Sequence, residues 1–391
     1  MHLKTLLEIL LVSTRLGFTS FGGPVAHLGY FHNEYVKRRN WLDDKAYADL
    51  VALAQFIPGP ASSQVGIGIG LMRGGLMGAI LSFIGFTFPS VLALMIFATL
   101  MQSFDISQAG WIHGLKLVAV AVVAHAILGM GQKLAPDRTR ASIAIITLIL
   151  LLVWQTVYSQ VILIVLAGLA GLIIYRGNKD ENPVDLGIRL SYRFASICLV
   201  TFFSLLVALP ALRNVFTSDL FALFDSFYRA GALVFGGGHV VLPLLEREVV
   251  PAGIVGAEDF LAGYGATQAV PGPLFTFASY LGTVANGWIG GLVATIAIFL
   301  PAFLLILGTL PFWNVIRKNP TIQGALLGVN AAVVGILAAA FYNPIFTNAV
   351  TSSVDFALAA GLFGLLVFWK VPAWMVVLIG AAGGTVIFMF L

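Results

Sequence analysis

Two copies of a Pro-Gly-Pro triplet have the residue types and spacing best suited to binding chemistry. The triplets are Pro58-Gly59-Pro60 and Pro271-Gly272-Pro273. Proline lacks an N–H group and its backbone angle suits a first helical turn, so a helix is expected to begin at the second proline of each triplet. The unpaired N–H groups and the dipole at such a helix end attract anions. Neutral donors nearby extend this candidate oxyanion site: Gln55, Ser62, Ser63, Gln268 and Thr276. The alternative is that each triplet only ends a helix at a surface turn.

A glycine pair with an arginine upstream precedes each triplet. The glycines are Gly22-Gly23 and Gly236-Gly237, and the arginines are Arg15 and Arg229. Glycine permits tight turns, but it also permits close helix packing, so a binding role and a packing role stay open. An arginine in an apolar segment is costly and usually functional, and it can hold an oxyanion with two hydrogen bonds. It can equally pair with a carboxylate.

Two matched carboxylates, Glu34 and Glu248, follow the glycine pairs. Burial raises the pKa of a carboxyl group, so either residue is a candidate for taking up a proton as an anion passes. The alternative is an ion pair with an arginine that holds the repeat together.

The composition places these residues in a membrane. Hydrophobic residues make up 59% of the 391 residues and charged residues 10%, against about 25% in soluble domains. Apolar runs without alternation predict helices, so the expected fold class is an all-α integral membrane protein. One cysteine and six histidines suggest no disulfide, metal site or cofactor. Neither an enzyme nor a nucleic-acid-binding protein is expected. The predicted spans include 76–101, 109–132, 194–209, 289–310 and 371–391, with 141–175 as two short spans.

The chain repeats itself. A shift of 214 residues superposes Arg15 on Arg229 and Glu34 on Glu248, and a shift of 213 superposes the triplets and places Gly74 on Gly287. Apolar pieces of about 12 residues flank the first triplet, at 46–57 and 61–72, and each is too short to cross about 30 Å of hydrocarbon. They are expected to be half-helices that meet inside the membrane, where transporters place their substrates.

Charged loops predict the orientation of the two halves. Lysine and arginine mark cytoplasmic loops. Lys37, Arg38 and Arg39 lie in a loop whose counterpart, 251–256, has no basic residue, and two later loops also reverse. We therefore expect two inverted repeats, a cytoplasmic N-terminus and an outside C-terminus. The expected domains are a first repeat at 1–175, a cytoplasmic linker at 176–193, a connecting helix and outer loop at 194–217 and a second repeat at 218–391.

Several stretches resemble the chromate transporter family in its long, duplicated bacterial form. They are FGGPVAHL, FHNEYV, RRNWLDDKAYADLVALAQFIPGPASSQVGIGIG, FGGGHVVLPLLEREVV and AEDFLAGYGATQAVPGPLFTFASYLG. The resemblance implies a multi-pass protein of the bacterial inner membrane that exports chromate, driven by membrane potential or proton motive force, and confers resistance. An anion channel, or a carrier for another oxyanion such as sulfate, is the alternative. The expected partners are the oxyanion and lipid, with a homodimer as a candidate assembly.

Overall fold

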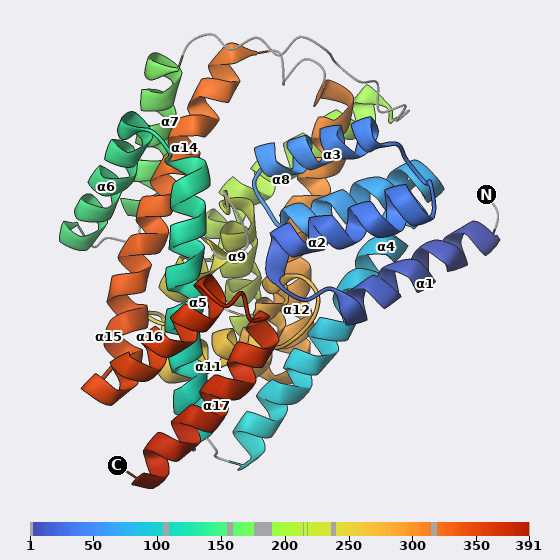
Figure 1. Ribbon diagram of the computed structural model, residues 1–391. Coiled ribbons are helices and arrows are strands. Elements are labelled where there is room, and N and C mark those ends of the chain that lie inside the picture. Colours follow the sequence, from blue (N-terminus) through green and yellow to red (C-terminus); the bar gives the residue numbers. More distant parts are fainter. Residues whose placement is uncertain are drawn as a thin grey trace. The chain divides into compact units, whose positions relative to one another are not determined.

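The computed structural model describes residues 3–104, 109–154, 159–175, 190–213, 215–216, 218–235, 240–313 and 319–390 (Figure 1). Within these residues all regular structure is helical and no strand occurs. Five of the described helices are long and apolar enough to cross a membrane: Ala61–Ser103, Gly110–Leu134, Tyr192–Leu212, Leu274–Phe312 and Thr321–Ala349. The predicted all-α membrane class is therefore confirmed. Most of the predicted linker lies outside the described residues, as do Gly236 and Gly237.

The helices divide into two compact units, each assembled from separate parts of the chain. The first unit comprises residues 1–106, 184–241 and 266–313, and the second comprises 107–183, 242–265 and 314–391. Helices of the first unit are α1 (Leu3–Thr19), α2 (Gly23–Phe31), the π-helix η1 (His32–Arg38), α3 (Asp44–Phe56), α4 (Ala61–Phe104), α8 (Tyr192–Leu212), α9 (Asp219–Ala232), the 3-10 turn η4 (Leu274–Thr276), α12 (Phe277–Thr309) and η5 (Leu310–Phe312).

Helix α4 is a hairpin of two antiparallel arms. Gly74 and Gly75 have non-helical backbone angles, and Gly75 has a φ of 59°. The Ser82 hydroxyl donates to the Gly66 carbonyl at 2.8 Å, whereas a straight helix would separate residues 16 apart by about 24 Å. A side chain at Gly70 would overlap the carbonyl of Gly78 in the other arm. Glycine at this crossing therefore lets the two arms touch along their backbones.

Helix α12 repeats this hairpin. The reversal lies at Asn286 and Gly287, whose φ values of −141° and 60° match −140° and 59° at Gly74 and Gly75. Gly75 is thus equivalent to Gly287, so the shift is 212 at this turn. The predicted superposition of Gly74 on Gly287 was wrong by one residue. The missing residue falls between the triplet and the turn, where the second copy begins with the 3-10 turn η4.

Two further antiparallel pairs lie in the part of the first unit before the second arm of α4. Helix α1 meets η1, which continues α2, through Ser13 and Tyr35, whose hydroxyl groups lie 3.2 Å apart. Helix α3 packs against the first arm of α4, where a methyl group at Gly68 would lie 2.6 Å from a Leu50 side-chain carbon. The first pair reverses near Gly22 and the second near Gly59. Each glycine element therefore lies at the tip of a helical hairpin.

The second arms of α4 and α12 are the long elements of the first unit. Helix α1 packs on α4, with Gly17 against the Phe86 carbonyl, and α9 packs on α12, with Gly231 against the Ile298 carbonyl. Gln102, near the end of α4, donates to the Val284 carbonyl beside the α12 turn at 2.8 Å. The α4 turn lies at the start of the second arm of α4, so the two turns lie at its opposite ends.

The second unit contains α5 (Gly110–Leu134), α6 (Arg138–Val153), α7 (Ser159–Ile174), α10 (Val241–Val249), α11 (Ala257–Thr267), α14 (Pro320–Ala340), η6 (Phe341–Phe346), α15 (Thr347–Ala349), α16 (Ser353–Val367) and α17 (Ala373–Phe390). Helices α6 and α7 correspond to the two short spans predicted at 141–175. Asp137 caps α6, and the backbone N–H and guanidinium of Arg140 hold the pKa of its carboxyl below the ordinary value.

Candidate functional site

Each Pro-Gly-Pro triplet is hydrogen-bonded to the glycine tip of the other repeat. The Gly59 N–H donates to the Val234 carbonyl at 2.7 Å, and the Gly272 N–H donates to the Ser20 carbonyl at 2.9 Å. Both glycines have positive φ values, 121° and 103°, that side chains of L residues rarely allow. The fold thus joins the two elements singled out in the sequence, and it does so twice.

The first triplet opens a helix as the sequence predicts. Pro60 accepts from the Gln64 N–H at 3.0 Å, and α4 begins at Ala61. The first N–H groups of a helix have no intrahelical acceptor, so those of Ala61, Ser62 and Ser63 are available at the triplet. The side chains of Ser62 and Ser63 are buried.

The second triplet opens the 3-10 turn η4 instead of an α-helix. The Thr276 N–H and hydroxyl both donate to the Pro273 carbonyl, at 3.0 and 2.7 Å. Thr276 was predicted as an oxyanion donor, but in this structure its hydroxyl proton is used within the turn. Gln268, just before the triplet, is 9% exposed and its side-chain nitrogen has no partner among the described residues.

Buried polar atoms without a partner gather in this part of the first unit. Leaving such atoms unpaired costs roughly 1–3 kcal/mol each, so they mark places where water or a ligand is expected to bind. Within the described part of the chain, these unpartnered atoms include Ser20 Oγ, His27 Nε2, Ser63 Oγ, Gln64 Oε1, Thr87 Oγ1 and Gln268 Nε2. Ser63 and Gln268 were predicted. The other four were not, because the sequence shows a polar residue but not the absence of its partner.

The surroundings of the two triplets differ in the polar group nearest the central glycine. A Cβ atom at Gly272 would lie 2.8 Å from Ser90 Oγ, and one at Gly59 would lie 3.6 Å from the Ala302 methyl group. Ser90 and Ala302 are equivalent at the shift of 212 found for the hairpin turns. At the first triplet the nearest polar group is the side-chain amide of Gln64, which donates to the Pro58 carbonyl at 2.8 Å.

The matched arginines occupy different environments. Arg229 makes two hydrogen bonds to Asp225, at 3.0 and 3.2 Å, and Arg213 lies 3.6 Å from the same carboxylate. Asp225 is fully buried. At the position equivalent to Asp225 the first repeat has Leu11, and Arg15 is exposed on α1. An ion pair is thus present in the second repeat, with a partner four residues upstream that the sequence analysis missed.

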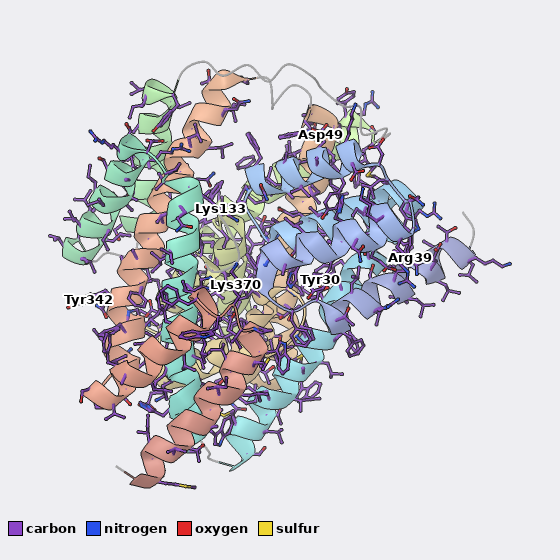
Figure 2. The ribbon with its side chains drawn as sticks, in the orientation of Figure 1. Tyr30, Arg39, Asp49, Lys133, Tyr342 and Lys370 are labelled. Atoms are coloured by element: carbon purple, nitrogen blue, oxygen red, sulfur yellow. The ribbon has the colours of Figure 1, made fainter. Side chains whose placement is uncertain are left out.

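Glu34 forms an ion pair with arginine, which is one of the two roles that the sequence left open for it; the other is proton uptake. Arg39 Nε donates to its carboxylate at 2.7 Å and Arg38 at 3.0 Å (Arg39 is labelled in Figure 2). Arg39 also reaches Glu8 on α1 at 2.8 Å. Burial raises the pKa of Glu34, but the hydrogen bonds from the two arginines outweigh it and hold the pKa below the ordinary value of 4.5.

The remaining predicted site residues are not drawn together. Gln55 is exposed on α3, and Glu248 belongs to the second unit, which is described separately. The arrangement that the structure does provide is a set of helix ends and neutral polar groups around two glycine-centred hydrogen bonds. Neutral donors at helix N-termini suit an anion.

The chain is similar to known transport proteins. The family model described as chromate transporter matches residues 7–172 and 221–385, once in each half of the chain. An uncharacterized transporter of Methanocaldococcus jannaschii is 27% identical over 97% of this chain and 94% of its own length. A chromate transport protein of Pseudomonas aeruginosa is 27% identical over 94% and 89%. No solved structure matches. The chain therefore belongs to the chromate transporter family, in its duplicated form, and is a transporter by family rather than an enzyme.

Proposed function

We propose that this protein is a secondary active transporter that exports chromate across the bacterial cytoplasmic membrane and confers chromate resistance. The observation that carries the proposal is the reciprocal pair of hydrogen bonds at Gly59 and Gly272. Those bonds hold the start of α4 and the start of η4 beside the glycine tips, where unpartnered polar atoms gather. The family match supports chromate as the transported ion.

The proposed site binds the oxyanion with neutral donors. Free N–H groups at the start of α4, the hydroxyl of Ser63 and the side-chain amide of Gln268 can each donate to an oxygen of the anion. A site of this kind needs no buried cation, whose transfer from water would cost several kcal/mol. Arg15, Arg229, Gly22 and Gly23 stay predicted contributors to binding.

We further propose inverted repeats at 1–175 and 218–391, joined by the linker at 176–193 and the connecting segment at 194–217. The support is the position of the two hairpin turns, Gly74–Gly75 and Asn286–Gly287, at opposite ends of one arm of α4. Arg73, beside the first turn, lies 5.3 Å from the ring of Trp41 in the basic loop. Basic loops are cytoplasmic, so the α4 turn and the N-terminus are assigned to that side and the C-terminus to the outside.

The hairpins α1–α2 and α3–α4 are proposed to be re-entrant. Both start and end near the basic loop, because Glu8 and Arg73 contact residues of that loop, and both carry a glycine element at the tip. Their tips would lie at mid-depth, which is where transporters with broken helices bind substrate.

The topology can be tested by labelling single cysteines in a Cys198→Ser background, since Cys198 is the only cysteine. Lys45→Cys and Ala252→Cys are suitable, because both positions are exposed and neither has the positive φ found at Asn40 and Gly253. Impermeant maleimide applied to whole cells is expected to label position 252 and not position 45. Labelling of both positions from one side would overturn the inversion.

Export is tested with everted membrane vesicles. A dianion gains about 4.6 kcal/mol per 100 mV on leaving a negative interior, from about 2.3 per charge. Vesicles with a positive lumen should therefore accumulate chromate in a saturable way, and dissipating the potential should abolish accumulation. If chromate still accumulates after the potential is dissipated but not after the pH gradient is removed, the driving force is the proton gradient. No uptake under either gradient would overturn the proposed export.

A channel, or a carrier for another oxyanion, is the second candidate. Interrupted helices occur in both classes, so flux decides between them. A carrier gives saturable chromate flux that chromate in the opposite compartment accelerates, and a channel does not. Sulfate that competes with chromate at similar concentrations would widen the substrate class. The homodimer expected from the sequence stays a prediction.

A further inference from the structure

His27 is a buried histidine with one free ring nitrogen beside the proposed oxyanion site. It lies in the middle of α2, is fully buried and packs edge-on against Phe86 at 5.4 Å. Its Nδ1 lies 3.4 Å from the hydroxyl of Ser62, at the start of α4. Nε2 has no hydrogen-bond partner among the described residues. The ring therefore links α2 to the N-terminal end of α4.

Packing alone does not require histidine at this position. The shift of 214 that superposes Glu34 on Glu248 places His27 on Val241, which is also fully buried. The second repeat thus fills the equivalent place with an aliphatic side chain. A histidine in the first repeat adds a polar nitrogen that the fold leaves unpaired, at a cost of roughly 1–3 kcal/mol without a ligand.

The groups around His27 are neutral or bear the positive end of a helix dipole. Ser62 and Phe86 face it from α4, the Ser20 carbonyl lies beside it, and Tyr47 of α3 donates to the adjacent Leu28 carbonyl at 2.6 Å. None of these contacts supplies a negative charge. The start of α4 disfavours an imidazolium while the site is empty, and a bound anion reverses that preference.

We propose that His27 donates a hydrogen bond to the oxyanion and takes up one proton when the anion binds. The proton comes from solvent, attaches to the ring nitrogen that lacks one, and returns to solvent when the anion leaves. No other bond forms or breaks. This assignment rests on the proposed oxyanion site, and it makes the anion bind more tightly as the pH falls.

Proton uptake tests the assignment without transport. Purified protein is mixed with chromate at about pH 8 in weak buffer with an indicator dye. The wild-type protein should take up about one proton per bound chromate, and His27→Gln should take up none. His125→Gln is the control, because His125 is an exposed histidine in α5 of the second unit, and it should behave as the wild type does. Equal uptake by His27→Gln and wild type, or uptake by neither, would overturn the proposal.

Flux measurements then separate this inference from the proposed function. His27→Phe, which removes both the donor and the titrating group, should raise the KM for chromate about tenfold at high pH, as expected for one lost hydrogen bond to a charged ligand, and by more as the pH is lowered. His27→Gln keeps a donor, so its KM should match the wild type at high pH but fail to fall as the pH is lowered. If the wild-type protein transports chromate and His27→Gln shows the same pH dependence of the KM, the proposed role of His27 is contradicted. Absence of wild-type flux contradicts the proposed function, and proton uptake still decides the role of His27.

Discussion

The Gly59 N–H donates a 2.7 Å hydrogen bond to the carbonyl oxygen of Val234, although 175 residues separate them in the sequence. The bond from Gly272 to Ser20 is its counterpart in the other direction, because Gly59 is equivalent to Gly272 and Ser20 to Val234. Neither triplet can move away from the opposite tip without breaking a buried backbone hydrogen bond. A conformational change that opens the site to the other side of the membrane is therefore expected to move each triplet together with the glycine tip of the other repeat.

Replacing either central glycine with alanine should reduce transport strongly. At φ values of 121° and 103° alanine is strained, and its methyl group would lie 2.8 Å from Gln64 Nε2 or from Ser90 Oγ. We expect Gly59→Ala and Gly272→Ala each to cost about 1–3 kcal/mol of stability and most of the chromate flux. Thermal unfolding in detergent and vesicle uptake measure the two effects.

Gly253→Ala is the matched control for these variants. Gly253 has a φ of 69°, but a Cβ atom there meets nothing within 4 Å. This variant carries backbone strain without a clash and without a neighbouring polar cluster. Its transport should stay near the wild-type rate. If Gly253→Ala reduced flux as much as Gly272→Ala, the loss would come from strain alone and not from the site.

The α4 hairpin should be sensitive to any side chain at its crossing point. A methyl group at Gly70 would overlap the Gly78 carbonyl, whereas one at Gly129 in α5 meets nothing within 4 Å. Gly70→Ala is expected to destabilise the protein by about 1–3 kcal/mol through overpacking. Gly129→Ala should be neutral or slightly stabilising, since alanine favours helix. Equal melting temperatures for the two variants would contradict the close contact of the arms.

The sequence predicts the start of α4 at the Pro-Gly-Pro triplet better than it predicts the antiparallel packing on either side of Gly74 and Gly75. Proline at position 60 limits the local backbone, so the beginning of that helix can be read directly. The reversal at Gly74 and Gly75 depends instead on contact between Gly70 and Gly78 of separate arms. A glycine spacing in one sequence is equally compatible with packing against another helix. The fold class and the division of α4 into pieces at 61–72 and 76–101 were therefore predictable, whereas the contact between its two arms was not.

The residues of the candidate site were predictable only where they lie close to a Pro-Gly-Pro triplet in the sequence. Helix-end N–H groups follow from proline, and Ser63 and Gln268 are close to the triplets in sequence. Ser20, His27 and Thr87 become candidates only because folding buries each one without a partner. The different environments of Arg15 and Arg229 were readable, because aspartate precedes Arg229 by one helical turn and leucine precedes Arg15.

The buried pair of Asp225 and Arg229 should couple strongly. Removing Arg229 leaves the fully buried carboxylate of Asp225 with only Arg213 at 3.6 Å, so Arg229→Leu is expected to cost about 3–5 kcal/mol. Asp225→Leu combined with Arg229→Leu removes both charges and should cost less than the sum of the two single changes. A double-mutant cycle on melting temperature in detergent measures the difference. Additive losses would contradict the pairing seen here.

Glu34 should affect stability more than proton coupling. Its pKa in the folded protein lies below the ordinary value of 4.5, so its contribution is complete above about pH 4.5 and is lost as the pH falls through the lower, folded-state pKa. Glu34→Gln should therefore be less stable than the wild type by about 1–3 kcal/mol, a deficit constant between pH 6 and 8 and smaller below pH 4.5. Because the carboxylate stays ionised throughout the physiological range, the pH profile of chromate flux should keep its shape. A profile that loses its pH dependence in Glu34→Gln but not in His27→Gln would assign proton coupling to the carboxylate instead of the histidine.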